Sequence, residues 1–222
     1  MKEKYFYDSS LNFWPPWADV LLTILLMLIL YIFIQYIAYS RAAIDELMNV
    51  RQKQILLESE IEKNFAGDYN KDIKVSRDAN LQKISFSDKI LFDLAKADLK
   101  DRGKEVLYRI GVILKNNPFY SKIQIEGHTD DLPINSARHT FPSNWELSSA
   151  RATSVVRYLQ ENVGIAPKFL SSTGYSEYQP VAPNQDDESR GRNRRIELVL
   201  VYTTLEDSSA TGMKYSDKQS KR

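Results

Sequence analysis

An unbroken apolar run near the start of the chain restricts its fold more than any other feature. The 21 residues from Ala18 to Ala38 include only three clearly polar side chains, those of Asp19, Thr23 and Gln35. A helix rises ~1.5 Å per residue, so this length crosses a hydrocarbon core of about 30 Å. Tryptophans at 14 and 17 and tyrosines at 36 and 39 suit the two interfacial belts. The run therefore predicts a transmembrane helix over residues 14–40. It is too long for a signal peptide, and no convincing Ala-x-Ala site follows it.

The single carboxylate in this run, Asp19, has two interpretations. If the helix starts near Pro16, Asp19 lies in the first turn, where the helix dipole favours an acid. Thr23 lies four residues on and shares its face, however, so the two residues form a polar stripe on an apolar surface. Intramembrane carboxylates are mostly functional because they cost ~2.5–3.5 kcal/mol at a helix centre. The residues alone leave two roles open, an ion-carrying role for Asp19 and Thr23 and a capping role for Asp19.

Composition restricts the rest of the chain. At 222 residues it has room for one ordinary domain besides this helix, and its net charge of +1 gives no reason to expect a nucleic-acid partner. Cysteine is absent, which excludes disulfides, thiol catalysis and zinc sites built on cysteine.

The segments around the apolar run divide the chain further. Residues 1–13 are expected to form a short polar and aromatic tail, and the cations on either side of the apolar run do not decide its orientation. Residues 41–72 are expected to be a helical linker, because they are rich in helix formers and end at the breaker "AGDYNKD". We favour a solvated stalk or a dimerisation helix here, while a plug that covers a pore stays an alternative. The Ser- and Lys-rich tail, residues 206–222, is expected to be disordered.

Residues 73–205 alternate strand and helix patterns, which predicts an α+β domain. "LQKISFSDKILF" indicates a strand with a turn, and "KIQIEGHTD", "KFLSSTGYS" and "RRIELVLVY" indicate further strands. "DLKDRGKEVLYRIGVILKNN" predicts a helix that buries Val106, Leu107, Ile110, Ile113 and Leu114. "NWELSSARATSVVRYLQENVG" predicts a second helix, with Asn144 as possible N-cap and Gly164 as its stop.

Charged residues gather in three clusters of this domain. Asp130 and Asp131 follow a strand, Arg151 lies inside the second helix, and Arg194 and Arg195 open the last strand. Arginine could hold a ligand carboxylate while an aspartate holds its ammonium group. The alternative is an internal salt-bridge network, which the charge pattern alone favours.

Four ordered motifs, "GHTDD", "PSNWELSSARA", "GYSEYQPVAPN" and "RGRNRRIEL", resemble the OmpA C-terminal-like domain, a non-covalent peptidoglycan-binding module. The resemblance implies a βαβαβ-like fold with a mixed sheet. It also implies that Asp130 and Arg151 bind the diaminopimelate of the stem peptide, with support from Arg194 or Arg195. Asn144, in the second motif, is included in this binding set.

The form "FPSNWELS" and the long segment before it resemble the flagellar stator subunit MotB and its relatives, and ZorB of an anti-phage system shares their layout. Stator subunits of this type carry an aspartate at the start of a single transmembrane helix, and Asp19 is the matching position. The resemblance implies a homodimer inside about five copies of a MotA- or ZorA-like multi-pass subunit. It further implies a bacterial inner-membrane protein with a cytoplasmic N-terminus and a periplasmic domain. A proton is the expected ion and sodium an alternative, with no cofactor and no enzymatic activity.

Other interpretations have less support. A passive anchor between membrane and wall is the second one, with Asp19 as a cap only. A zinc-dependent wall hydrolase using His128, His139 and Asp130 ranks third, because no tight ligand motif exists. Trp145, near the start of the second predicted helix, is expected to pack in the core or a loop instead of stacking on a sugar.

Overall fold

The computed structural model describes residues 14–67, 72–134 and 140–202. The predicted tails, the centre of the "AGDYNKD" breaker and His139 lie outside these residues. The chain divides into two compact units, residues 1–45 and 46–222, and helix α1 (Trp14–Asn64) contributes to both.

In the first unit, α1 presents its apolar side chains to the exterior. It is the one helix among the described residues that is long and apolar enough to cross a membrane. Its most apolar stretch has a mean hydropathy of 2.6 and no buried residue, unlike the core helix of a soluble protein. By length and composition, α1 therefore matches the predicted span.

In the second unit, the last turns of α1 pack on the domain. Val50, Leu57 and Ile61 are buried in the hydrophobic core. Gln54, on the same face, donates from Nε2 to the backbone oxygens of Ala79 and Leu81, at 3.1 Å each. These turns differ from the solvated stalk, one of the two interpretations that the sequence favoured. Met48 and Ile55, on the same helix, are exposed.

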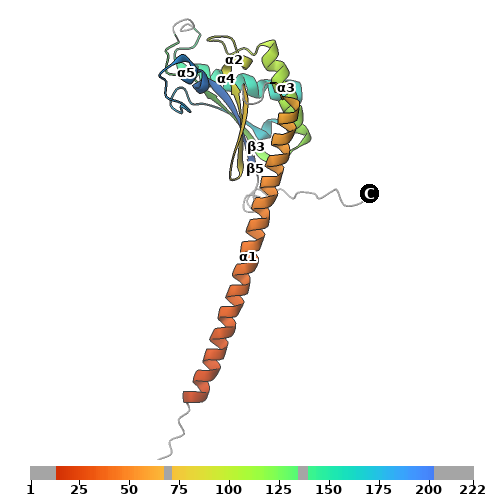
Figure 1. Cartoon of the computed structure of the whole chain (residues 1–222), viewed down its shortest axis with the longest axis vertical. Helices are drawn as coiled ribbons and strands as arrows, with labels where there is room; N and C mark the ends of the chain where they lie inside the picture. The colour runs from red at the N-terminus through yellow and green to blue at the C-terminus, as the bar shows by residue number, and fades with distance from the viewer. Residues whose placement is uncertain (1–13, 68–71, 135–139, 203–222) are drawn as a thin grey trace, which may run out of the picture. The chain divides into compact units, whose positions relative to one another are not determined.

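The domain is built on a five-stranded mixed sheet in the order β1-β2-β5-β3-β4 (Figure 1). Only β3 and β4 are parallel, and the other neighbours are antiparallel. The strands are β1 (Ile73–Asp78), β2 (Leu81–Ser87), β3 (Tyr120–His128), β4 (Leu170–Gly174) and β5 (Arg195–Tyr202). The expected mixed sheet is confirmed, and β1 adds a strand at the start of the predicted domain that the sequence did not predict.

In the described part of this domain, four helices and two short helical turns accompany the sheet. They are α2 (Asp88–Leu91), α3 (Asp101–Asn116), α4 (Asn144–Tyr158), a π-helical turn (Leu159–Val163), a 3₁₀ turn (Pro167–Phe169) and α5 (Asp187–Asn193). In α3, all five apolar residues predicted to lie on one face are buried. The helical segment that follows α4 stops at Gly164, which adopts a left-handed φ of +79° as predicted for a helix end.

The start of α4 differs from the prediction. Its N-cap is Ser143, whose Oγ accepts a hydrogen bond from the Trp145 amide at 3.2 Å. Glu146 accepts in return from the Ser143 amide at 2.8 Å, which completes a capping box. Asn144 is therefore free of the capping role that we expected, and its side chain bonds elsewhere.

Candidate functional site

Two glycines let α4 lie against the sheet. A Cβ atom on Gly127 would lie 2.2 Å from the Ser148 carbonyl oxygen, and one on Gly174 would lie 2.2 Å from Ser149 Oγ. Both distances are far below van der Waals contact, so only glycine permits this approach. Arg151 lies one turn further along α4, where it reaches the charged residues at the ends of β2 and β3.

A cluster of two acids and two arginines forms there, which we call the charge cluster: Asp88, Asp130, Arg151 and Arg194. Arg151 Nη1 lies 3.0 Å from Asp88 Oδ1, and Arg194 Nη1 pairs with Asp130 Oδ2. The Asp88 amide also donates to the Arg194 backbone oxygen at 3.0 Å. The formal charges of the four side chains cancel.

The inner pair of the charge cluster is almost fully removed from water. The side chain of Arg151 is 3% exposed and that of Asp88 9%. Arg151 Nε also donates to the Lys96 backbone oxygen at 2.8 Å, and its guanidinium lies 5.2 Å from the centre of the Phe92 ring. Burial raises the pKa of Asp88 and lowers that of Arg151, while their mutual attraction opposes both shifts.

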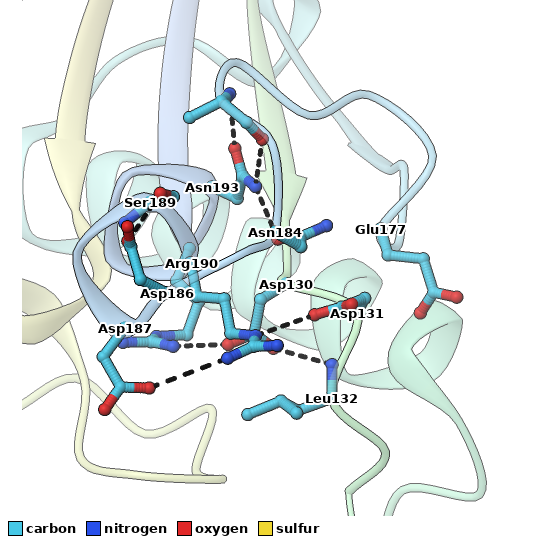
Figure 2. A network of polar contacts seen from close by, with 12 residues as sticks. Asp130, Asp131, Leu132, Glu177, Asn184, Asp186, Asp187, Ser189, Arg190 and Asn193 are labelled. Atoms are coloured by element: carbon cyan, nitrogen blue, oxygen red, sulfur yellow. Dashed lines mark hydrogen bonds and ion pairs between the residues drawn. The ribbon is translucent and has the colours of Figure 1, made fainter.

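The outer pair is held by the loop after β3. Asp130 Oδ1 accepts from the Leu132 amide at 3.3 Å, while its other oxygen faces Arg194. The neighbouring Asp131 pairs instead with Arg190 of α5, at 3.1 Å (Figure 2). Arg194 is the most accessible member of the charge cluster, with 22% of its side chain exposed.

Asn144 connects two loops at this site. Its Nδ2 donates to the backbone oxygens of Asp130 (3.2 Å) and Leu132 (3.1 Å) and to Glu177 Oε2 (2.8 Å). The side chain thus fixes the loop that carries Asp130 against the loop that follows β4. Asn144 therefore positions the Asp130 loop through its backbone, and these hydrogen bonds do not include the charged groups of the charge cluster.

Arg195 does not join the charge cluster. Its Nε lies 2.6 Å from Glu197 Oε1, and Lys83 Nζ lies 3.1 Å from the other oxygen of the same carboxylate. Burial raises the pKa of Glu197, but Arg195 and Lys83 outweigh this effect and hold it below its ordinary value. Of the two arginines that the sequence offered as alternatives, only Arg194 lies beside Asp130.

Glu126, His128 and Glu197 could in principle hold a cation, because their ligand atoms lie within 4.8 Å of one another. Lys83 and Arg195 already balance the two carboxylates, however, so a divalent ion would have to displace them. The ring of His128 stacks on Tyr175 at 5.3 Å between centroids. This grouping gives no support to a hydrolase that uses His128 with Asp130.

Asp19 lies in the first unit, on α1. The helix begins at Trp14 and has no acid in its first turn, so Asp19 lies beyond the turn where a helix dipole acts strongly. Thr23 donates from Oγ1 to the Val20 backbone oxygen at 2.8 Å, which leaves the acceptor lone pairs of its hydroxyl unused by this bond.

Sequence reasoning missed three residues that shape the site. Asp88 lies in a predicted strand and turn, and no motif marks it as the partner of Arg151. Asn193 is fully buried and holds the segment after β4, where its Oδ1 accepts from the amides of Val181 (2.9 Å) and Ala182 (3.0 Å). Glu177 could have been considered, because it lies inside the third quoted motif.

Comparisons with known proteins agree with this geometry. Residues 91–194 match the OmpA family. Motility protein B of Bacillus subtilis is 39% identical over 118 residues, which are 53% of this chain and 44% of that protein. The chain thus spans under half the length of this curated relative.

Two solved structures share the fold of the domain. A putative MotB-like protein from Desulfovibrio vulgaris superposes with a TM-score of 0.65 at 29% identity, covering 72% of this chain and 95% of that one. The cell wall anchor of the T6SS from Pseudomonas aeruginosa superposes with a TM-score of 0.58 at 29% identity, covering 65% and 96%.

Proposed function

Because residues 91–194 form an OmpA-family domain of the MotB-like type, we propose that this chain is the wall-anchored subunit of an ion-driven stator. It is a structural, non-enzymatic component of the inner membrane. The domain lies in the periplasm and binds peptidoglycan, and the N-terminus lies in the cytoplasm. The apolar stretch of α1, which is long enough to cross a membrane, and the similarity to motility protein B support this arrangement.

The observation that carries wall binding is the balanced charge cluster. A diaminopimelate centre of the stem peptide carries an ammonium and a carboxylate group, so it can exchange with an internal ion pair without a change in net charge. The ammonium would take the place of Arg194 on Asp130, and the released guanidinium would hold the carboxylate in a bidentate fork. The inner pair, Arg151 and Asp88, would stay ion-paired and hold its position while the ligand binds.

Wall binding is tested by co-sedimentation of the full chain, in detergent, with diaminopimelate-type peptidoglycan. We expect Asp130→Ala and Arg151→Ala to lose most binding, because truncating a buried hydrogen-bonded charge costs about 2–5 kcal/mol or more. Asp131→Ala is the matched control, since it removes an acid from the same loop that pairs outside the charge cluster. Equal binding by correctly folded Asp130→Ala and wild type would reject the site.

Asp19 is proposed as the carboxylate that carries the ion, with Thr23 beside it. Its place beyond the first turn of α1 weakens the capping alternative, and intramembrane acids are usually functional. A proton is the expected ion, and sodium would require ligands from a partner. One span cannot enclose an ion path, so the proposal includes a MotA-type multi-pass subunit. If the neighbouring gene encodes a ZorA-type subunit, the proposed ion-driven stator would serve in phage defence.

The chain is also proposed to act as a homodimer, two copies inside a ring of about five partner subunits. Met48 and Ile55 of α1 are exposed and seven residues apart, as in a helical dimer seam, although Arg51 lies between them. This face is separate from the buried one that holds Val50 and Leu57.

A passive anchor is the second candidate function. Similarity to the cell wall anchor of the T6SS from Pseudomonas aeruginosa favours it, because that protein's name describes anchoring. Both candidates require the charge cluster, but only the stator requires a titratable group at Asp19. Exchange of Asp19 for Asn therefore discriminates between them.

A further inference from the structure

Two large aromatic side chains lie exposed beside the proposed binding site. Trp145 is 47% exposed and Tyr178 66% exposed, and their rings stack with centroids 5.4 Å apart and planes at 29°. Of the two places that the sequence left open for Trp145, the core and a loop, the structure shows packing against a loop residue. About half or more of each residue stays exposed in spite of the stacking, and exposed apolar surface can mark an interaction site.

The aromatic pair is fixed to the same residue that positions Asp130. Asn144, which precedes Trp145, bonds to the Asp130 backbone oxygen at 3.2 Å and to Glu177 Oε2 at 2.8 Å. Glu177 in turn precedes Tyr178 along the chain. The two rings are therefore held close to the loop of Asp130 by one side-chain amide, and the Ser143 capping box fixes the backbone at Trp145.

We propose that Trp145 and Tyr178 form a platform that stacks on a sugar ring of the peptidoglycan glycan strand. This proposal rests on the proposed wall-binding function and names the part of the ligand outside the charge cluster. Sugar rings present C–H groups on one face, and the negative face of an aromatic ring attracts them.

The covalent structure of the ligand makes this placement reasonable. Two stem-peptide residues and a lactyl group join diaminopimelate to the glycan sugar, so a short covalent linker separates the two groups. A ligand held at Asp130 thus brings a sugar close to this loop region. A protein partner would also find an exposed aromatic pair attractive, and the experiment below distinguishes it from a sugar.

The experiment compares two soluble ligands by calorimetry with the full chain in detergent. One is the free stem tripeptide that ends in diaminopimelate, and the other is the same tripeptide on its disaccharide. We expect wild type to bind the disaccharide form about three- to tenfold more tightly, in the range of an aromatic stacking contribution. Trp145→Ala should lose this advantage and keep its affinity for the free tripeptide, while Trp145→Phe should keep part of it.

Tyr178→Ala should reduce the same advantage. Tyr108→Ala is the matched control, because Tyr108 on α3 is also half exposed, at 49%, and lies outside the site. If wild type binds both ligands equally, or if Trp145→Ala keeps the full advantage, the platform is wrong and the wall-binding function stands. If Trp145→Ala weakens both ligands alike, its role is structural and the platform is also wrong. If wild type binds neither ligand, the proposed function fails, and the platform fails with it.

Discussion

Arg151 is surrounded by groups that compensate its charge, and Asp88 is its closest acid. Their atoms lie 3.0 Å apart with almost no exposure, so neither group can rely on water for its solvation. Buried ion pairs add little to stability compared with apolar replacements, but the loss of one partner is costly. The pair is thus better explained as a rigid part of the proposed ligand site than as a source of stability.

Substitution of Arg151 by Leu should reveal this coupling through pH. At pH 7 we expect a loss of about 3–5 kcal/mol in the free energy of unfolding, because Asp88 stays buried without its partner. Burial already raises the pKa of Asp88 above 3.8, and loss of Arg151 raises it further. The folded state then binds a proton that the unfolded state releases, so stability falls as pH rises through the folded pKa and returns as pH falls.

The measurement is urea unfolding of the full chain in detergent at pH 7 and pH 5, followed by near-ultraviolet circular dichroism. The deficit of Arg151→Leu relative to wild type should be smaller at pH 5. Adding Asp88→Asn to the same variant should remove most of the pH dependence, because the titrating group is gone. A deficit that is identical at both pH values, with or without Asp88→Asn, would contradict the buried pair.

The residues of the site were predictable only in part. Asp130, Arg151 and Arg194 belong to recognisable motifs, and the structure brings them together. Asp88 was not predictable, because its pairing depends on where α2 and α4 meet in space. The choice between Arg194 and Arg195 was also open in the sequence. Neighbouring residues at the start of a strand point to opposite faces, and the sequence does not say which face holds the site.

At the scale of elements, the spacing of apolar residues predicted the buried face of α3 but not that of α1. The buried face of α3 follows a regular apolar pattern and was predicted residue by residue. The buried face of α1 includes Gln54, whose Nε2 donates to backbone oxygens of the β1–β2 hairpin. A polar residue at a core position hides the pattern, and exposed apolar residues such as Ile55 suggest a different face.

Two adjacent leucines of α1 test this packing. Leu57 is 3% exposed and Leu56 is 56% exposed. We expect Leu57→Ala to lower the free energy of unfolding by about 2–5 kcal/mol because it leaves a cavity in the core. Leu56→Ala should change it by less than about 0.5 kcal/mol. Urea unfolding of both variants provides the comparison, and equal small effects would instead indicate a solvated stalk.

At the scale of the whole molecule, the two compact units supply different chemistry. The first offers an apolar stretch of α1 whose one carboxylate is that of Asp19, and the second offers a balanced charge cluster that is proposed to bind the wall. A motor that works against the wall needs both, since an ion-driven subunit without an anchor would transmit no force. A passive anchor needs only a membrane helix, whatever its side chains.

Proton influx measured with the Asp19→Asn variant tests the central claim most directly. The chain and its multi-pass partner are produced together in cells that carry a pH-sensitive fluorescent reporter, and cytoplasmic acidification is recorded alongside wall binding. Asn keeps the size of the side chain and removes its titratable group. We expect the variant to retain wild-type binding to peptidoglycan and to lose proton influx and the motor phenotype. Influx and phenotype equal to wild type would contradict the stator and leave the passive anchor.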